Sequence, residues 1–282
     1  MTRLPAGARR RSGRIPSPKR RPRHVDGPIP RSILAGQDEG IFRVLPQTVI
    51  DNLRRPASEN ALVWNLLYPQ ARPTLSLRSL LSLRPLWGSA LAEEPDESLT
   101  PYFWGYTISG ERLDSLDDAL DSVDGPGQQT EVDVFLVGTR SLVLVEAKHL
   151  AAPGRCGRYL RGRCPEVHVE SRGEGPGCRY WEAGEADFST ALEFGSRPMP
   201  DSPPPACAVH YQLGRTLLLS RALAHRLGLS PHVWMIVPGR RWPRLERSWL
   251  DFADRLRDPA DWRALRVLAW EDVRRLTSDP QG

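Results

Sequence analysis

Two short apolar runs separated by a polar turn form the clearest hydrophobic pattern in the chain. The runs cover about residues 131–137 and 142–148, and only a few charged residues interrupt them. Apolar runs of this kind, bounded by turn residues, predict a β-hairpin. We expect Val137 to pair with Leu142 across the turn.

This register brings three charged residues of the hairpin together. Asp133 lies directly opposite Glu146, and Lys148 projects from the same face as Glu146 because residues two apart in a strand share a face. Side chains opposite one another have Cβ atoms about 4.5–5.5 Å apart. Like charges at that separation destabilise a sheet, so the pattern predicts a compensating divalent cation.

Further helices and strands are predicted on both sides of the hairpin. Helical patterns cover residues 58–68, 76–91, 112–123, 207–227, 245–257 and 271–276, and strand patterns cover 102–108, 233–237 and 265–270. Ser58 is the expected N-cap of the first helix, and Gly228 is the expected end of the longest one. The alternation of helices and strands after the hairpin predicts an α/β core with a mixed sheet.

Length and composition agree with a globular protein. A chain of 282 residues forms one large domain or two small ones, and 40% apolar residues support a sizeable core. The longest apolar stretches, such as 233–237, are too short to span a membrane. The basic N-terminus lacks the apolar segment of a secretory signal. We therefore expect a cytoplasmic protein with reduced cysteines and no membrane partner.

The net charge of +5 combines a basic tail with a mildly acidic body. Residues 1–31 hold ten basic residues and one acidic residue, whereas residues 32–282 hold 29 basic and 33 acidic ones. The tail has almost no large apolar side chains, so we expect it to be disordered. It either contacts nucleic-acid phosphates or is simply a solvated extension. Residues 32–282 are expected to form a single domain.

Residues 149–206 differ from the rest of that domain and are predicted to be an insertion. Glycine, proline and arginine are frequent there, and the hydrophobic periodicity is weak. All four cysteines lie in this segment or directly after it, 8, 14 and 29 residues apart: Cys156, Cys164, Cys178 and Cys207. Four thiolates can hold a structural Zn²⁺, and four cysteines also bind iron–sulfur clusters. Because no Cys-x-x-Cys pair occurs, ordinary buried cysteines are the alternative.

Lys148 is the only lysine in residues 32–282. Arginine stays protonated in proteins, whereas lysine carries a compact charge and its pKa can be lowered by burial. Lysine is therefore the basic residue suited to a position beside a metal-bound water. The alternative is a structural ion pair between Lys148 and Glu146, although buried charges in an apolar strand are costly without a function.

The pattern Asp133-x(12)-Glu146-Ala147-Lys148 resembles the core motif of the PD-(D/E)XK nuclease superfamily. The (D/E)XK half is complete, whereas Val132 replaces the proline of the other half. The resemblance implies a restriction-endonuclease-like mixed sheet flanked by helices. It also implies that Asp133 and Glu146 bind Mg²⁺ or Mn²⁺, with the carbonyl of Ala147 as a further ligand. Lys148 would then assist the attacking water.

Two more residues match positions that members of this superfamily use. Glu59, at the start of the helix over 58–68, matches an upstream acid that binds the metal; alternatively, it is a first-turn acid that favours the helix dipole. Gln212 lies on the helix after the insertion, where many members carry Gln or Tyr. It would hold a catalytic water or a phosphate, or it is simply a polar residue at a helix start.

These features predict a Mg²⁺-dependent nuclease that hydrolyses phosphodiester bonds, with DNA favoured as the substrate by the family resemblance. The superfamily implies products with 5′-phosphate and 3′-hydroxyl ends, and many of its endonucleases are homodimers. One alternative is a nucleic-acid-binding protein of the same fold that does not cut. The other is an unrelated α/β protein in which the charged residues form a structural ion pair.

Overall fold

The computed structural model describes residues 34–68, 80, 82–88, 97–126, 129–149, 151–168, 177–182, 184–199 and 204–278. The predicted basic tail, residues 1–31, lies outside this part of the chain. No helix in the described segments is long and apolar enough to cross a membrane.

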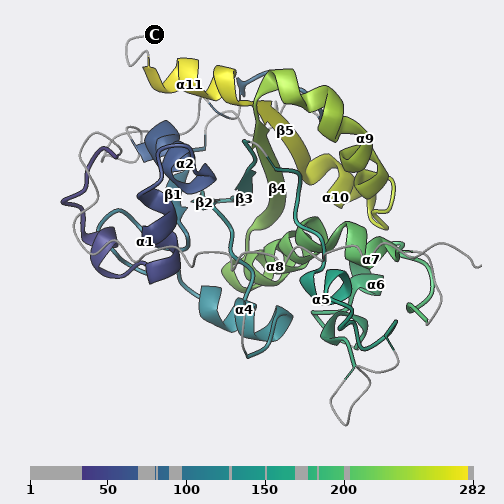
Figure 1. The fold of residues 1–282 in the computed structure, drawn as a ribbon. Helices are drawn as coiled ribbons and strands as arrows, with labels where there is room; N and C mark the ends of the chain where they lie inside the picture. Colours follow the sequence, from purple (N-terminus) through teal and green to yellow (C-terminus); the bar gives the residue numbers. More distant parts are fainter. Residues whose placement is uncertain are drawn as a thin grey trace, which may run out of the picture.

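Five strands form an open sheet in the middle of the described structure (Figure 1). In spatial order they are β1 (Thr100–Phe103), β2 (Val134–Val137), β3 (Ser141–Ala147), β4 (Ser230–Val237) and β5 (Leu265–Ala269). The first three strands pair antiparallel, whereas β3, β4 and β5 run parallel. The predicted α/β core with a mixed sheet is therefore confirmed.

The hairpin of β2 and β3 has the predicted register. Val137 pairs with Leu142, and Val134 pairs with Val145. Glu97 fixes the turn, because its Oε1 accepts hydrogen bonds from the backbone N–H groups of Arg140 and Ser141, at 2.6 and 3.0 Å. β2 is shorter than the apolar run over 131–137 that predicted it, whereas β3 has the predicted length and begins one residue earlier than the run over 142–148.

Helices cover both faces of the sheet (Figure 1). One face carries α1 (Gln47–Leu53), α2 (Glu59–Leu67) and α11 (Trp270–Ser278), and the other carries α4 (Leu116–Val123) and α8 (Tyr211–Leu227). Alternate residues of β3 supply the two cores. Leu142 and Leu144 pack in the core that contains α4 and α8, whereas Val143 and Val145 pack in the core that contains α1 and α2.

Further elements complete the described structure. They are α5 (Gly157–Leu160), α6 (Phe188–Ala191), α7 (Ala206–Val209), α9 (Trp242–Ala253) and α10 (Pro259–Ala264), with 3-10 turns η1 (Gly40–Arg43), η4 (Arg179–Trp181) and η5 (Gly239–Arg241). In the described residues of the predicted insertion, 149–206, the elements are α5, η4 and α6, and α7 begins at its last residue. Its weak hydrophobic periodicity agrees with such short helical turns.

The ends of two predicted helices are confirmed. The Ser58 hydroxyl accepts a hydrogen bond of 3.1 Å from the backbone N–H of Ala61 at the start of α2. Helix α8 ends at Gly228, which has a φ of 69° and therefore adopts a left-handed conformation that glycine favours. The helix predicted over 207–227 is divided in two, because the backbone at His210 departs from helical geometry between α7 and α8.

The strand predicted over 102–108 is wrong beyond Phe103. Trp104 and Gly105 have φ angles of 50° and 85°, which turn the chain back on itself. The turn closes with a hydrogen bond of 2.7 Å from the Phe103 N–H to the Tyr106 carbonyl. The aromatic residues after Phe103 therefore form a tight turn beside the start of β2, although their composition favours a strand.

The helix predicted over 76–91 is also wrong in part. Only Leu80 and residues 82–88 of it are described, and residues 83–88 are not helical. Pro85 lacks a backbone N–H and cannot continue a helix. Trp87 instead forms an antiparallel bridge with Val267 at the edge of β5.

Candidate active site

Asp133, Glu146 and Lys148 lie together where β2 begins and β3 ends. Glu146 shares its face of β3 with Leu144, and that face packs toward α8. All three charged side chains are buried, with 9% of Asp133, 1% of Glu146 and 7% of Lys148 exposed. Buried charged groups require partners, so their contacts indicate what the site can do.

The Asp133 carboxylate is held by the opposite strand. Its Oδ2 accepts a hydrogen bond of 2.8 Å from the backbone N–H of Ala147. Burial raises the pKa of Asp133 and Glu59 adds to the rise, whereas Lys148 and the Ala147 N–H oppose it. The N–H and C=O of an extended residue point to the same side of its strand. The Ala147 carbonyl therefore lies on the side of Asp133, as the predicted ligand set requires.

The Glu146 carboxylate is held by helix α8. Its Oε2 accepts a hydrogen bond of 2.7 Å from Nε2 of Gln212, and its Oε1 accepts one of 3.1 Å from Oγ1 of Thr216. Burial raises the pKa of Glu146 to about 7, with a further contribution from Asp133, while Lys148 opposes the rise. Such an elevated pKa indicates that the ionised carboxylate lacks sufficient positive charge around it.

Lys148 is the cation of the group. Its Nζ lies 3.4 Å from Oε2 of Glu146 and 3.8 Å from Oε2 of Glu59. Burial alone would lower the pKa of Lys148, but Glu146, Asp133 and Glu59 outweigh burial and raise it above its usual value. The side chain is therefore an ammonium at neutral pH, and it acts in this arrangement as a fixed positive charge.

Glu59 reaches the site from the opposite side of the sheet. It is the first residue of α2, and its Oε1 accepts a hydrogen bond of 2.8 Å from the backbone N–H of His149. The contact joins α2 to the chain directly after β3. The structure therefore brings Glu59 to the same group as Asp133, Glu146 and Lys148, in addition to its place in the first helical turn.

Gln212 also contacts the site, although differently from the prediction. Its Nε2 donates to Glu146, while its Oε1 accepts a hydrogen bond of 2.6 Å from the backbone N–H of Gly154. Both ends of the amide are thus engaged, and Gln212 orients the Glu146 carboxylate. Thr216 was not predicted. Its spacing of one helical turn from Gln212 is the signal that identifies it, because such residues share a helix face.

The donor set suits a hard divalent cation. Three carboxylates, those of Asp133, Glu146 and Glu59, surround the one ammonium of Lys148, so the ionised group carries an excess of negative charge. Mg²⁺ binds oxygen ligands and usually requires only one or two carboxylates, with water completing its octahedron. No three His, Cys, Asp or Glu side chains in the described segments are placed to hold a metal jointly. Asp133 and Glu146, with the Ala147 carbonyl, supply a set that Mg²⁺ can use.

The four cysteines line one small cavity of about 20 Å³ in the insertion. None of them forms a disulfide. Burial raises the pKa of the Cys178 thiol to about 11 and that of Cys207 to about 12, and the neighbouring thiols contribute to both. Both thiols are therefore protonated at neutral pH in the metal-free fold. The described cysteines are not placed to hold a metal ion jointly. Zinc or iron–sulfur binding stays a prediction that metal analysis of the purified protein tests.

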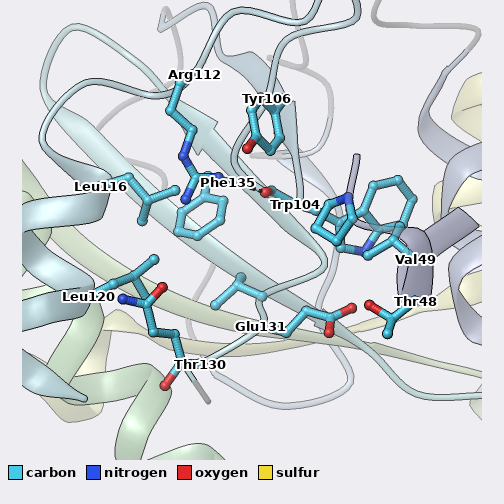
Figure 2. Close-up of a pocket in the computed structure, with 13 residues that line it drawn as sticks. Thr48, Val49, Trp104, Tyr106, Arg112, Leu116, Leu120, Thr130, Glu131 and Phe135 are labelled. Carbon is cyan, nitrogen blue, oxygen red and sulfur yellow. Dashed lines mark hydrogen bonds between the residues drawn. The ribbon is translucent and has the colours of Figure 1, made fainter. Parts of the chain in front are cut away.

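A second cavity, of about 180 Å³, lies beside the segment that leads into β2 (Figure 2). Trp104, Arg112 and Phe135 are among its lining residues, and Figure 2 shows the Glu131 carboxylate close to Thr48. Burial and the nearby Asp133 raise the pKa of Glu131. The three charged residues of the hairpin do not line this cavity, so it is a neighbour of the candidate site and not part of it.

Comparison of the chain with protein-family models, with curated proteins and with solved structures found no match. The fold and the contacts of the site therefore carry the functional argument.

Proposed function

We propose that this chain is a Mg²⁺- or Mn²⁺-dependent nuclease with a restriction-endonuclease-like fold, which hydrolyses phosphodiester bonds of DNA. The observation that carries this proposal is the buried group of Asp133, Glu146 and Lys148 at the end of the hairpin. Three carboxylates share one ammonium there, and the raised pKa of Glu146 reflects the missing positive charge. A divalent cation with a phosphodiester bound to it would supply that charge.

The residues of the site have distinct roles in this proposal. A divalent cation, when bound, lowers the pKa of a water ligand and neutralises charge on the phosphate. Asp133 and Glu146 supply the carboxylate oxygens that hold the cation, and the Ala147 carbonyl lies beside them. Gln212 and Thr216 keep Glu146 in the orientation that this binding requires.

Lys148 contributes its ammonium charge. Because its pKa is raised in the absence of a cation, Lys148 starts as a donor that can orient the attacking water or the phosphate. Preorganised positive charge of this kind stabilises the charge that develops on phosphate oxygens during hydrolysis. A cation beside Lys148 would lower the pKa of the ammonium by charge repulsion, which would bring the lysine closer to accepting a proton.

A second candidate is an unrelated α/β protein in which the charged residues form a structural ion pair. The 3.4 Å contact between Lys148 and Glu146 favours it, because the same contact would serve a purely structural ion pair. Such a pair is replaceable: changing both partners together to apolar residues is often tolerated in proteins. A nuclease, in contrast, loses its activity when either residue is replaced.

Cleavage of plasmid DNA by the purified full chain tests the proposal. We expect nicking or cutting with Mg²⁺ that stops when EDTA is added. Asp133→Asn and Glu146→Gln remove a charge and keep the side-chain shape, so both variants should fold and fail to cut. Glu246→Gln is a matched control, because Glu246 is an exposed carboxylate on α9. Equal cleavage by all three variants would refute the proposal.

A further inference from the structure

A large cavity lined by arginines lies between the insertion and helix α8. Its volume is about 420 Å³, within the range of about 300–1,000 Å³ that is common for ligand sites. Five arginines line it: Arg155, Arg158, Arg161, Arg179 and Arg215. Asp124 is the only carboxylate among the described lining residues, so the wall of the cavity is strongly positive.

Two of these arginines are occupied by structural contacts. Arg215 lies 3.0 Å from the Asp124 carboxylate, and its guanidinium lies over the ring of Tyr211, at 4.9 Å from the ring centroid. Arg179 donates hydrogen bonds to the carbonyl groups of Ser122 and Asp121, at 2.6 and 3.0 Å, near the end of α4. These contacts fix one wall of the cavity and use its only carboxylate.

The other three arginines line the cavity from the insertion. Arg155, Arg158 and Arg161 lie on and around α5, and all three are exposed. None of them forms an ion pair with a carboxylate in the part of the chain that the structure describes. Arg179 and Arg215, in contrast, both have protein partners. Three guanidinium groups without one, gathered at a cavity, suit an anion from outside the chain.

Hydrogen bonds link a segment next to the cavity to the candidate active site. Gly154, next to Arg155, donates its N–H to Oε1 of Gln212 and accepts a hydrogen bond of 3.0 Å from the Gln212 N–H. Gln212 in turn contacts Glu146 and follows Tyr211, which lines the cavity. The arginine wall is therefore fixed to the same residue that orients a metal-binding carboxylate.

We propose that this arginine cavity binds phosphate groups of the nucleic-acid strand beyond the bond that is cut. This inference deepens the proposed nuclease function and rests on it. Guanidinium groups bind phosphate through paired N–H donors, and they carry their charge at any physiological pH. The insertion then has a function of its own: it positions the substrate backbone relative to Glu146.

Binding of a fluorescein-labelled DNA duplex to the full chain in EDTA tests this inference without any cleavage. The variant is Arg158→Gln together with Arg161→Gln. The matched control is Arg244→Gln together with Arg247→Gln, an exposed pair with the same spacing on α9. Each phosphate contact contributes about 0.9 to the slope of log affinity against log salt concentration, so losing two contacts should reduce the slope by about 1.8. We expect the variant to lose about 10-fold in affinity at low salt and the control to change little.

Each outcome separates this inference from the proposed function. If the wild type cuts DNA and both double variants bind duplex equally well, the cavity proposal fails and the nuclease proposal stands. If the wild type never cuts but the cavity variant alone loses binding, the nuclease proposal fails and phosphate binding stands. If the cavity variant loses only binding of adenosine 5′-monophosphate and keeps duplex binding, the cavity holds a free nucleotide and the inference is overturned.

Discussion

Gln212 donates a hydrogen bond of 2.7 Å from its Nε2 to Oε2 of Glu146, which ties helix α8 to the carboxylate at the end of β3. Thr216, one helical turn later, donates to the other oxygen of the same carboxylate. Glu146 is therefore oriented from one helix, while Asp133 is oriented by the backbone of the hairpin. The two carboxylates that we propose as metal ligands thus depend on different parts of the fold.

The first prediction concerns Thr216 as a positioning residue. Thr216→Val removes the hydroxyl and keeps the shape, so we expect the Mg²⁺ concentration for half-maximal cleavage to rise about 10- to 100-fold. Thr216→Ser retains the hydroxyl and should restore cleavage close to that of the wild type. A Mg²⁺ titration of the cleavage rate measures both. Wild-type Mg²⁺ dependence in Thr216→Val, with a loss in Thr216→Ser, would show that packing of the methyl group matters and the hydrogen bond does not.

The second prediction concerns pH and the free energy of unfolding. The pKa of Glu146 is about 7 in the metal-free fold, against 4.5 for an ordinary glutamate. The folded chain keeps a proton at pH values where the unfolded chain has lost it, so this group makes the fold less stable as the pH rises from about 4.5 to about 7. Glu146→Gln has no such proton to lose. The Tm of Glu146→Gln, measured relative to that of the metal-free wild type, should therefore rise as the pH increases over that range.

Addition of Mg²⁺ should stabilise the fold more strongly as the pH rises. The cation binds the ionised carboxylate and competes with its proton, so its stabilising effect should be larger at about pH 8 than at about pH 5. Differential scanning fluorimetry with and without Mg²⁺ measures this. A shift in Tm that is the same at both pH values would contradict the assignment of Glu146 as a ligand.

The third prediction concerns Lys148. Lys148→Met should reduce cleavage about 100-fold or more, because the ammonium beside the phosphate is lost. It should also reduce stability by leaving the buried Glu146 carboxylate without its cation. The double variant Glu146→Gln with Lys148→Met should recover stability without recovering cleavage. Recovery of cleavage in that double variant would rule out a catalytic role for both residues.

The fourth prediction separates the two roles of Glu59. Glu59→Gln keeps an acceptor for the His149 N–H, which the carboxylate now contacts at 2.8 Å. A residue that only caps the helix and joins it to the hairpin would tolerate this change. We expect instead a higher Mg²⁺ requirement with an unchanged Tm, because the negative charge near Lys148 is lost. Wild-type metal dependence in this variant would leave Glu59 with a structural role alone.

The hairpin could be predicted well because residues close together in the sequence determine its pairing. The alternation of side chains and the turn fix the pairing of Val137 with Leu142, and this pairing places Asp133 opposite Glu146. The first turn of α2 was equally predictable, since the side chain of Ser58 caps its own helix. The charged residues at the candidate site could therefore be chosen before their distances were known.

Contacts between distant segments were not predictable in the same way. The local pattern places Thr216 on the same face of α8 as Gln212, but the contact of that face with Glu146 depends on how α8 packs against β3. The arginine cavity is similar: its walls come from the insertion, from the region of α4 and from α8. The strand predicted beyond Phe103 was wrong for a local reason. Its aromatic composition favours a strand, but the backbone reverses direction at Trp104 and Gly105.

Binding of Mn²⁺ to the purified chain, followed by electron paramagnetic resonance, tests the central claim most directly. The signal of free Mn²⁺ reports how much of the ion each variant removes from solution. We predict that the wild type binds Mn²⁺, that Mg²⁺ displaces it, and that Asp133→Asn and Glu146→Gln bind it far more weakly while Glu246→Gln binds it normally. Equal binding by the wild type and the Asp133 and Glu146 variants would contradict a metal site at the end of the hairpin.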